Sequence, residues 1–237
     1  MADRFFTDKP LSLGEFVLDG PEAHHLGTVR RFAPGDAVVL FNGDGAEYPA
    51  EIVAVGKKQT ALFIRERRDV SRELRFEVVI GSALPKADRF DFLLEKLVEL
   101  GATRFVPLIT ERSINRPKGD KLDKMRRAVI EASKQCGRNR LMAVDNPMSL
   151  EAFLSPASRP REGSEFAKWI LHTASGVSSP KSNAADSVFA IGPEGGFTDG
   201  EIALALTHFW EPLSFGPRTL RTETAAIAAA SWAANRQ

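Results

Sequence analysis

The first third of the chain carries short apolar runs at close spacing, a pattern typical of β-strands. Residues 37–41, 51–55 and 60–64 are rich in β-branched and aromatic side chains. The first two runs are separated by Asn-Gly and Asp-Gly dipeptides at 42–45, which favour tight turns. The pattern predicts a small β-barrel or sandwich over residues 1–71, ending after a charged linker at 65–69.

From residue 72 onward, strand-like and helix-like runs alternate. Strands are predicted at 76–80, 104–109, 169–172 and 188–191. Apolar residues at three- and four-residue spacing from Phe90 to Val98 predict a helix that Gly101 ends, and a second amphipathic helix is expected over 121–135. Alternation of this kind favours a parallel α/β sheet, here a domain over 72–237. Polar stretches at 155–165 and 175–185 are expected to be surface loops.

Two glycine-containing turns near the C-terminus stand out, at residues 191–197 and 215–225. Each lies where an apolar run ends and a helical run begins, and such junctions line ligand pockets in α/β proteins. After the first turn, Thr198 and Glu201 form a Thr-x-x-Glu capping box. After the second, Thr222 can cap an alanine-rich helix over 224–234. Together the turns predict a pocket for a nucleotide-like ligand held mainly by main-chain groups.

Composition and charge add only modest constraints. The 237 residues are 43% hydrophobic and 27% charged, with a net charge of +1, so global charge gives no nucleic-acid signal. Between residues 84 and 141, 14 basic residues stand against 8 acidic ones. The single cysteine, Cys136, excludes an internal disulfide and a cysteine-based zinc cluster, and no metal is expected. With no signal-peptide core near Met1 and no run of about 20 apolar residues, we expect a cytoplasmic protein.

The two turns in combination resemble the paired C-terminal motifs of the RsmE family. The motifs are Ile-Gly-Pro-Glu-Gly-Gly at 191–196 and Gly-Pro-Arg-Thr-Leu-Arg-Thr-Glu-Thr-Ala at 216–225. Members of this family are SPOUT-class methyltransferases that act on uracil N3 of small-subunit (16S) ribosomal RNA. Supporting blocks extend the resemblance over nearly the whole chain, at 4–6, 25–36, 99–101, 111–113 and 135–138.

The resemblance implies a fold and a cofactor. It implies a PUA-like, RNA-binding β-barrel followed by an α/β SPOUT domain with a trefoil knot, acting as a homodimer. It also implies that S-adenosylmethionine binds in the knotted loops. Carried onto this sequence, the cofactor contacts would be Leu171, His172, Ile191, Gly192, Pro193, Glu194, Gly195, Gly196, Phe215, Gly216, Leu220, Arg221, Thr222, Thr224 and Ala225.

Methylation of uracil N3 requires a group that accepts the imide proton or that stabilises the resulting negative charge. We hypothesise that Arg221 stabilises or orients the uracil, while Glu194 or Glu223 accepts the proton or holds a loop. Contacts to RNA phosphates are expected from basic side chains. The candidates are Arg4, Arg31, Arg112, Arg116, Lys134, Arg138 and Arg140.

Two other functions are compatible with these motifs. One is a SPOUT methyltransferase acting on another RNA, such as tRNA. The other is an RNA-binding ribosome-assembly protein whose cofactor site is vestigial. Intact cofactor motifs favour an enzyme that methylates 16S ribosomal RNA over the second alternative. The adjacent His24 and His25 do not have a metal-ligand spacing, and Cys136 is expected to be a packed small residue rather than a nucleophile.

Overall fold

The computed structural model describes residues 3–114, 121–155, 166–173 and 186–235. The chain forms two compact units, Met1–Glu73 with Ile130–Leu141, and Leu74–Val129 with Met142–Gln237. Within the described ranges, no helix has the length and apolar character needed to cross a membrane. The loops predicted at 155–165 and 175–185 fall almost entirely outside the described residues.

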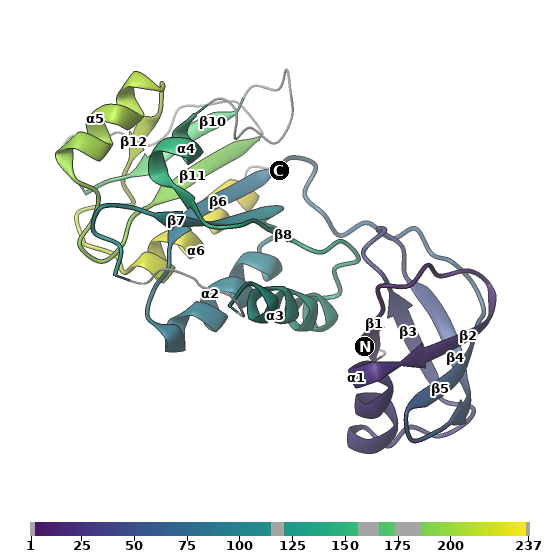
Figure 1. The fold of residues 1–237 in the computed structure, drawn as a ribbon. Coiled ribbons are helices and arrows are strands. Elements are labelled where there is room, and N and C mark those ends of the chain that lie inside the picture. The colour runs from purple at the N-terminus through teal and green to yellow at the C-terminus, as the bar shows by residue number, and fades with distance from the viewer. Residues whose placement is uncertain (1–2, 115–120, 156–165, 174–185, 236–237) are drawn as a thin grey trace. The chain divides into compact units, whose positions relative to one another are not determined.

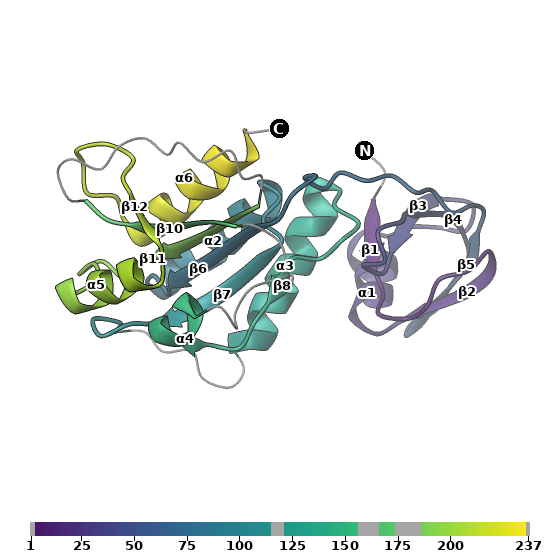
Figure 2. The same cartoon turned by 90° about the horizontal axis from the view of Figure 1, so that it is seen from above.

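The N-terminal unit is built on a five-stranded sheet with the order β1-β3-β4-β5-β2. In Figures 1 and 2 this sheet curls into a partial barrel. The β1 strand pairs with β3 in parallel, and the other pairs are antiparallel. Its elements are β1 (Arg4–Phe6), β2 (Gly14–Asp19), helix α1 (Gly20–His24), the π-helical turn η1 (His25–Val29), β3 (Ala37–Phe41), β4 (Tyr48–Val55) and β5 (Gln59–Ile64).

Alternating apolar residues of the sheet form the core of this unit. Leu40, Ile52 and Leu62 are buried at successive neighbouring strands, with Leu26 of the π-turn packed in the same cluster. Burial of large aliphatic side chains is the main favourable term for such a small unit. The three strands predicted from the sequence are confirmed as β3, β4 and β5.

The end of helix α3 (Lys121–Cys136) and the loop after it belong to the N-terminal unit. Polar bonds hold them there: Arg138 pairs with Glu73 at 2.5 Å, and the guanidinium of Arg4 donates to the Asn139 side-chain oxygen at 2.5 Å. Both arginines are buried, at 4% and 8% exposure. Because a buried charge is costly without a partner, these bonds couple residues 130–141 firmly to the curled sheet.

The C-terminal unit is a parallel sheet with the order β12-β10-β11-β6-β7-β8, and β9 also pairs with β7. Every strand pair in it is parallel. The strands are β6 (Val78–Ala83), β7 (Arg104–Ile109), β8 (Ala143–Val144), β9 (Met148–Ser149), β10 (Ala167–Leu171), β11 (Ser187–Ile191) and β12 (Glu211–Leu213). The central strands β6 and β11 are buried throughout, as expected where helices cover both faces of a sheet.

Helices cover both faces of this sheet, as Figures 1 and 2 show. On one face, α6 (Thr222–Ala234) packs against β6, β11 and α2 (Ala87–Glu99). On the other, α4 (Leu150–Leu154) packs against β7 and α5 (Asp199–Thr207). Gly81 in β6 leaves room for the ring of Phe153 from α4, since a Cβ there would lie 2.4 Å from the ring. The predicted parallel α/β sheet is confirmed.

Element boundaries agree with the sequence in most places. The strand at 104–109 is found at those residues, and Gly101 follows α2 with φ of +82°, the left-handed conformation expected of a helix-ending glycine. The strand predicted at 76–80 starts two residues later, as β6. The last helix begins at Thr222 rather than 224, and Thr222 does not cap it, because its hydroxyl bonds to another loop. The trefoil knot stays a prediction.

Candidate functional site

A pocket of about 270 Å³ opens at the carboxyl ends of the neighbouring strands β10, β11 and β12. In parallel sheets this edge collects the loops that bind ligands, because all strands end there together. Twelve of the fifteen residues predicted to contact the cofactor line the pocket: Leu171, His172, Ile191, Gly192, Pro193, Glu194, Gly195, Gly196, Phe215, Leu220, Thr222 and Ala225.

Three predicted cofactor residues, Gly216, Arg221 and Thr224, lie in the same loop or helix but do not line the pocket. Conversely, six lining residues were not predicted: Thr173, Phe197, Leu213, Ser214, Arg218 and Thr219. Each of these is next to or within the three predicted segments. Arg218 and Thr219 lie within the predicted segment 215–225, and extending the segments by one or two residues would have found the other four.

The first glycine turn is compact because of its backbone. The Gly196 N–H donates to the Pro193 carbonyl at 2.8 Å, and Gly196 has φ of +68°, where side chains are strained. A Cβ on Gly192 would lie 3.3 Å from both the Gly196 carbonyl carbon and the Phe197 ring. A side chain would therefore be strained at Gly196 and tightly placed at Gly192, and the turn presents main-chain groups to the pocket.

The two glycine motifs are joined directly by one side chain. Thr222, the first residue of α6, is buried and donates from its hydroxyl to the Gly192 carbonyl at 3.1 Å. This bond links the start of α6 to the turn after β11. The second motif thus holds the first in place across the pocket.

The loop after β7 supports the glycine turn from outside. Arg112 donates to the Gly195 carbonyl at 2.7 Å, and the Glu201 carboxylate accepts from the Glu111 N–H at 2.9 Å. Glu201 also completes the predicted capping box with Thr198, which the structure confirms. These bonds connect the loop after β7 to both the glycine turn and the start of α5. They restrain the turn in one conformation, as a pre-organised binding loop requires.

The lining of the pocket suits S-adenosylmethionine. Leu171, Ile191 and Leu220 offer apolar surface for an adenine ring, and Gly196 leaves open space beside its backbone that a Cβ would occupy. This combination of apolar walls and bare main chain fits the cofactor that the motifs imply.

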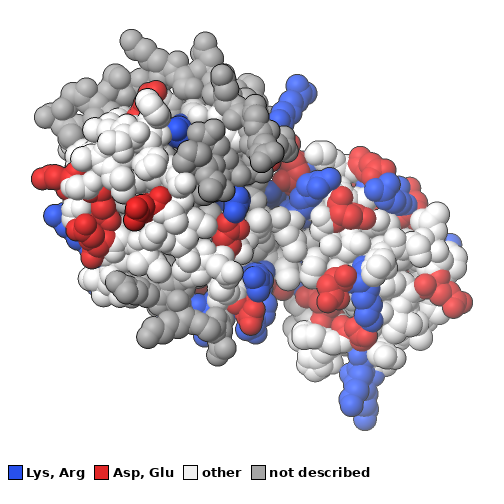
Figure 3. All heavy atoms as spheres, turned by 45° about the horizontal axis from the view of Figure 1, so that its top comes forward, with Lys and Arg blue, Asp and Glu red and all other residues white. Residues whose placement is uncertain are grey.

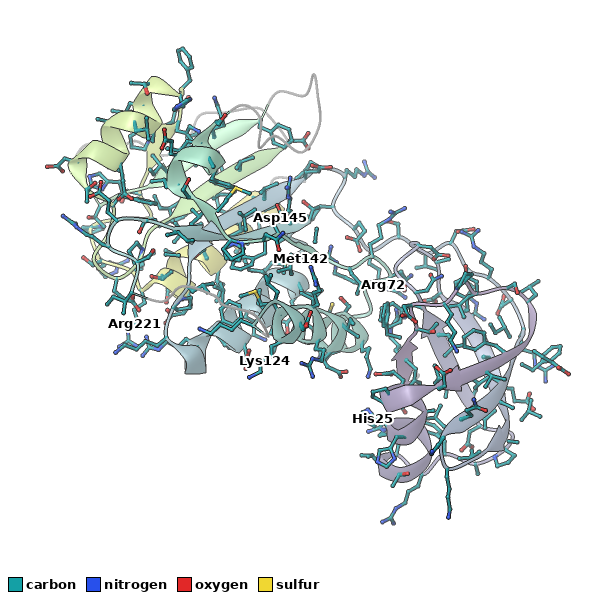
Figure 4. All side chains as sticks on the ribbon, viewed as in Figure 1. His25, Arg72, Lys124, Met142, Asp145 and Arg221 are labelled. Atoms are coloured by element: carbon teal, nitrogen blue, oxygen red, sulfur yellow. The ribbon has the colours of Figure 1, made fainter. Side chains whose placement is uncertain are left out.

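The three catalytic candidates differ in their surroundings. Glu194 is exposed and lines the pocket. Arg221 is exposed at the residue that precedes α6, and Figure 4 shows its position beside that helix. Glu223 is buried, and one of its oxygens accepts from Arg89 at 2.9 Å. Its other oxygen is buried without a partner among the described residues. Of these three candidates, Glu194 is the one that lines the pocket, and its exposed side chain can meet a substrate proton there.

The predicted phosphate-binding residues divide into two groups. Arg4, Lys134 and Arg138 are drawn into ion pairs with Glu47, Glu22 and Glu73 respectively. Burial lowers the pKa of Arg4, and the neighbouring Glu47 carboxylate partly offsets this effect. The charged form of Arg4 therefore depends on its ion pair with Glu47. A phosphate would have to displace a carboxylate to pair with any of these three side chains, and their contacts to RNA stay a prediction.

The second group stays accessible. Arg31, Arg112 and Arg140 are exposed, while Arg116 lies outside the described residues. On the face drawn in Figure 3, basic and acidic side chains of the N-terminal unit are intermingled, with no uniform basic area. Recognition of a polyanion on that face must therefore depend on individual sites rather than on a broad field.

Comparisons with known proteins agree with this arrangement. A family model described as an RNA methyltransferase domain matches residues 72–234, and one described as an RNA methyltransferase PUA domain matches residues 18–63. The ribosomal RNA small subunit methyltransferase E of Synechocystis sp. is 34% identical over 88% of this chain and 69% of its own length. That of Bacillus subtilis is 32% identical, covering 91% and 88%.

A solved structure is similar over the whole chain. It is a ribosomal RNA small subunit methyltransferase E from Neisseria gonorrhoeae bound to S-adenosyl methionine, with a TM-score of 0.89, 30% identity, and coverage of 98% of this chain and 96% of that one. The resemblance seen in the motifs, and the PUA-like and SPOUT fold classes that it implied, are confirmed. The chain therefore belongs to the ribosomal RNA small subunit methyltransferase E family of RNA methyltransferases.

Proposed function

We propose that the protein transfers a methyl group from S-adenosylmethionine to N3 of a uracil in 16S ribosomal RNA. The observation that carries this proposal is the pocket at the ends of β10, β11 and β12, where both glycine motifs meet. Its relatives by sequence are named ribosomal RNA small subunit methyltransferases, and the Neisseria structure holds S-adenosyl methionine.

The twelve lining residues that the motifs predicted are proposed as the cofactor contacts. When bound, S-adenosylmethionine supplies the electrophilic methyl group. The residues of this chain contribute position: the glycine turn admits the cofactor close to the backbone, and the Thr222 bond to Gly192 holds the two loops at a set separation. Fixing two reactants in line accounts for a large part of the acceleration in such displacements.

The imide proton of uracil must be removed or its charge offset for N3 to act as a nucleophile. Glu194 is proposed to accept that proton, because it is exposed at the pocket lining. Arg221 is proposed to stabilise the developing negative charge on the uracil. Glu223 is better suited to positioning, since its carboxylate is buried and bonded to Arg89.

The remaining expectations form part of the same proposal. The N-terminal domain, residues 1–71, would contact RNA, with Arg31 and Arg140 as exposed candidates, and Arg112 would do so beside the pocket. The protein would act in the cytoplasm as a homodimer, with a knotted cofactor-binding region.

Two measurements test this function. Calorimetry of the full-length protein with S-adenosylmethionine should show one binding site per chain, whereas a vestigial site would show no heat of binding. Mass spectrometry of 16S ribosomal RNA from a deletion strain should show loss of N3-methyluridine, restored by the wild-type gene. Persistence of N3-methyluridine without the gene would refute the assignment and favour another RNA, such as tRNA.

The role of Arg221 is tested by Arg221→Ala in a methylation assay. Loss of a charge-stabilising donor should lower kcat by about 100-fold or more, with little change in the affinity for S-adenosylmethionine. Arg126→Ala is a matched control, since Arg126 is exposed on α3 and its ion pair among the described residues is with Asp123 of the same helix. Unchanged turnover in a folded Arg221→Ala protein would remove Arg221 from the mechanism.

A further inference from the structure

A second pocket, of about 360 Å³, lies entirely within the N-terminal unit. It is formed where β1, the π-turn η1 and the end of α3 meet. The residues that decide its character are Phe5, His25, Arg30, Lys134 and Gln135. It shares no lining residue with the pocket at the glycine motifs.

The π-turn brings two of these side chains to the same pocket. The Arg30 N–H donates to the His25 carbonyl at 2.9 Å, a bond that spans five residues. An α-helix turns every 3.6 residues, so residues five apart would point to different faces, whereas the π-turn bond places them about one turn apart. Both His25 and Arg30 accordingly line the pocket.

Two residues in and after the π-turn are restricted by their backbone conformation or by close packing. Immediately after the π-turn, Arg31 has φ of +56°, a left-handed conformation that costs a non-glycine residue about 1–2 kcal/mol. Within the turn, a Cβ on Gly27 would lie 2.8 Å from a Val55 methyl carbon, so only glycine fits against β4. Single π-turns and strained residues of this kind occur frequently at functional sites.

The chemistry of the pocket suits a flat heteroaromatic ring. Phe5 is buried and packs edge-on with His25, with ring centroids 6.2 Å apart and an interplanar angle of 80°. This contact fixes the His25 imidazole, which is half-buried and leaves part of its surface accessible. Gln135 is exposed at the end of α3, with an amide that both donates and accepts hydrogen bonds. Figure 4 shows His25 at the end of α1.

Among the described residues that line the pocket, Arg4 is buried in an ion pair with Glu47, whereas Arg30 is an exposed cation. Lys134 is held by Glu22 at 2.9 Å and by Glu131 at 3.0 Å. Arg30 is exposed, and among the described residues its ion pair is with Asp3, whose side chain is also exposed. Ion pairs between exposed groups contribute little to stability. A phosphate can therefore replace Asp3 as the partner of Arg30 at small cost.

We propose that this pocket binds one unpaired nucleotide of the RNA substrate. The base stacks on His25, its edge bonds to Gln135, and its phosphate pairs with Arg30. Proteins commonly recognise RNA by stacking splayed-out bases on aromatic or histidine rings. The proposal rests on the proposed function only in taking RNA as the substrate, because the site is separate from the methyl-transfer pocket.

The test is binding of a fluorescent ten-nucleotide oligouridylate to the full-length protein, measured by anisotropy over a range of salt concentrations. His25→Ala should weaken binding about 5- to 100-fold, as expected for loss of one base stack, while His25→Phe retains most of the affinity. Neither should change calorimetric binding of S-adenosylmethionine. His24→Ala is the matched control, since His24 is exposed next to His25 but does not line the pocket.

Salt dependence separates the phosphate contact from the base contact. Arg30→Gln should reduce the slope of log affinity against log salt by about 0.7, whereas His25→Ala should leave that slope unchanged. Arg68→Gln is the control, an exposed arginine of the same unit paired with Glu66.

Three outcomes would overturn the proposal. The first is no oligouridylate binding by the wild-type protein, and the second is equal binding by His25→Ala and His24→Ala. The third is displacement by free uridine monophosphate at equal nucleotide concentration, which would assign the pocket to a free nucleotide. Each of them leaves methylation of 16S ribosomal RNA and cofactor binding intact if the proposed function is correct, so the two failures are distinguishable.

Discussion

Replacing Thr222 by valine removes the single side-chain bond that joins the two glycine motifs. Valine keeps the branched shape of threonine but has no hydroxyl to donate to the Gly192 carbonyl, now 3.1 Å from the Thr222 oxygen. Thr222 is 3% exposed, and Gly192, whose carbonyl accepts the bond, is half-buried at the pocket lining. The substitution therefore tests one contact with little change of volume.

The expected cost follows from the burial of this bond. A typical intramolecular hydrogen bond contributes about 0.5–1.5 kcal/mol to stability, and the loss approaches about 1–3 kcal/mol only where the acceptor left behind is fully buried. The Gly192 carbonyl is half-buried, so we expect a loss of about 1 kcal/mol. In a protein of this size, each kcal/mol lowers Tm by about 2–4 °C. If the bond also sets the separation of the loops, part of the same energy is lost from cofactor binding, and Kd should rise by up to about 5-fold.

The assay pairs thermal unfolding with calorimetry of S-adenosylmethionine binding. Thr207→Val is the control, since Thr207 is exposed at the end of α5 and, within the described part of the chain, its hydroxyl donates to the Leu204 carbonyl of its own helix. Thr222→Val should lower Tm and raise Kd, and Thr207→Val should change neither appreciably. A lower Tm with an unchanged Kd would show that the bond stabilises the fold alone, and would refute its role in shaping the pocket.

Two further variants test the packing and the charges of the units. Gly81→Ala places a methyl group 2.4 Å from the Phe153 ring and should destabilise the protein by about 1–3 kcal/mol in denaturant unfolding, with Phe153→Leu recovering part of the loss; additive effects would contradict this. Burial opposes ionisation of Glu47, but hydrogen bonds from Arg72 and Arg4 outweigh it, so the pKa of Glu47 lies below its ordinary value. Ionised Glu47 contributes to the free energy of unfolding above about pH 4.5, and this contribution is lost as the pH falls through the lowered pKa. The difference in stability between wild type and Glu47→Gln should therefore shrink in acid. A difference that does not change with pH would exclude this linkage.

Periodicity located the longer elements because their burial leaves a local trace. In the strand at 104–109, every residue after Arg104 is apolar, and the helix containing Phe90 and Val98 has an apolar stripe. Both patterns can be seen in a single stretch of sequence. The β8, β9 and β12 strands have two or three residues each. Such short strands carry no period, and they exist because a neighbouring parallel strand pairs with them.

Side-chain roles were harder to predict where they depend on distant partners. Thr222 has the local context of a helix cap, yet its hydroxyl bonds to Gly192, 30 positions away in sequence. Residues 130–141 continue or follow an amphipathic helix, yet they pack with the N-terminal unit through Arg138 and Asn139. Neither partner can be identified from local spacing, since both contacts join residues that are far apart in sequence and meet only in the folded chain.

The cofactor pocket was the most predictable site because two local signals coincide there. Glycines that a turn requires and a capping box that starts a helix are both encoded within a few residues, and the parallel order of the sheet brings such junctions to one edge. Basic residues carry no equivalent signal. Arg138 and Arg140 are two positions apart, but one is buried against Glu73 and the other is exposed. An arginine that stabilises the fold and one that can bind a phosphate differ in burial, which the local sequence does not reveal. Contacts to RNA are therefore best sought among exposed side chains beside a pocket, as at Arg30 and His25.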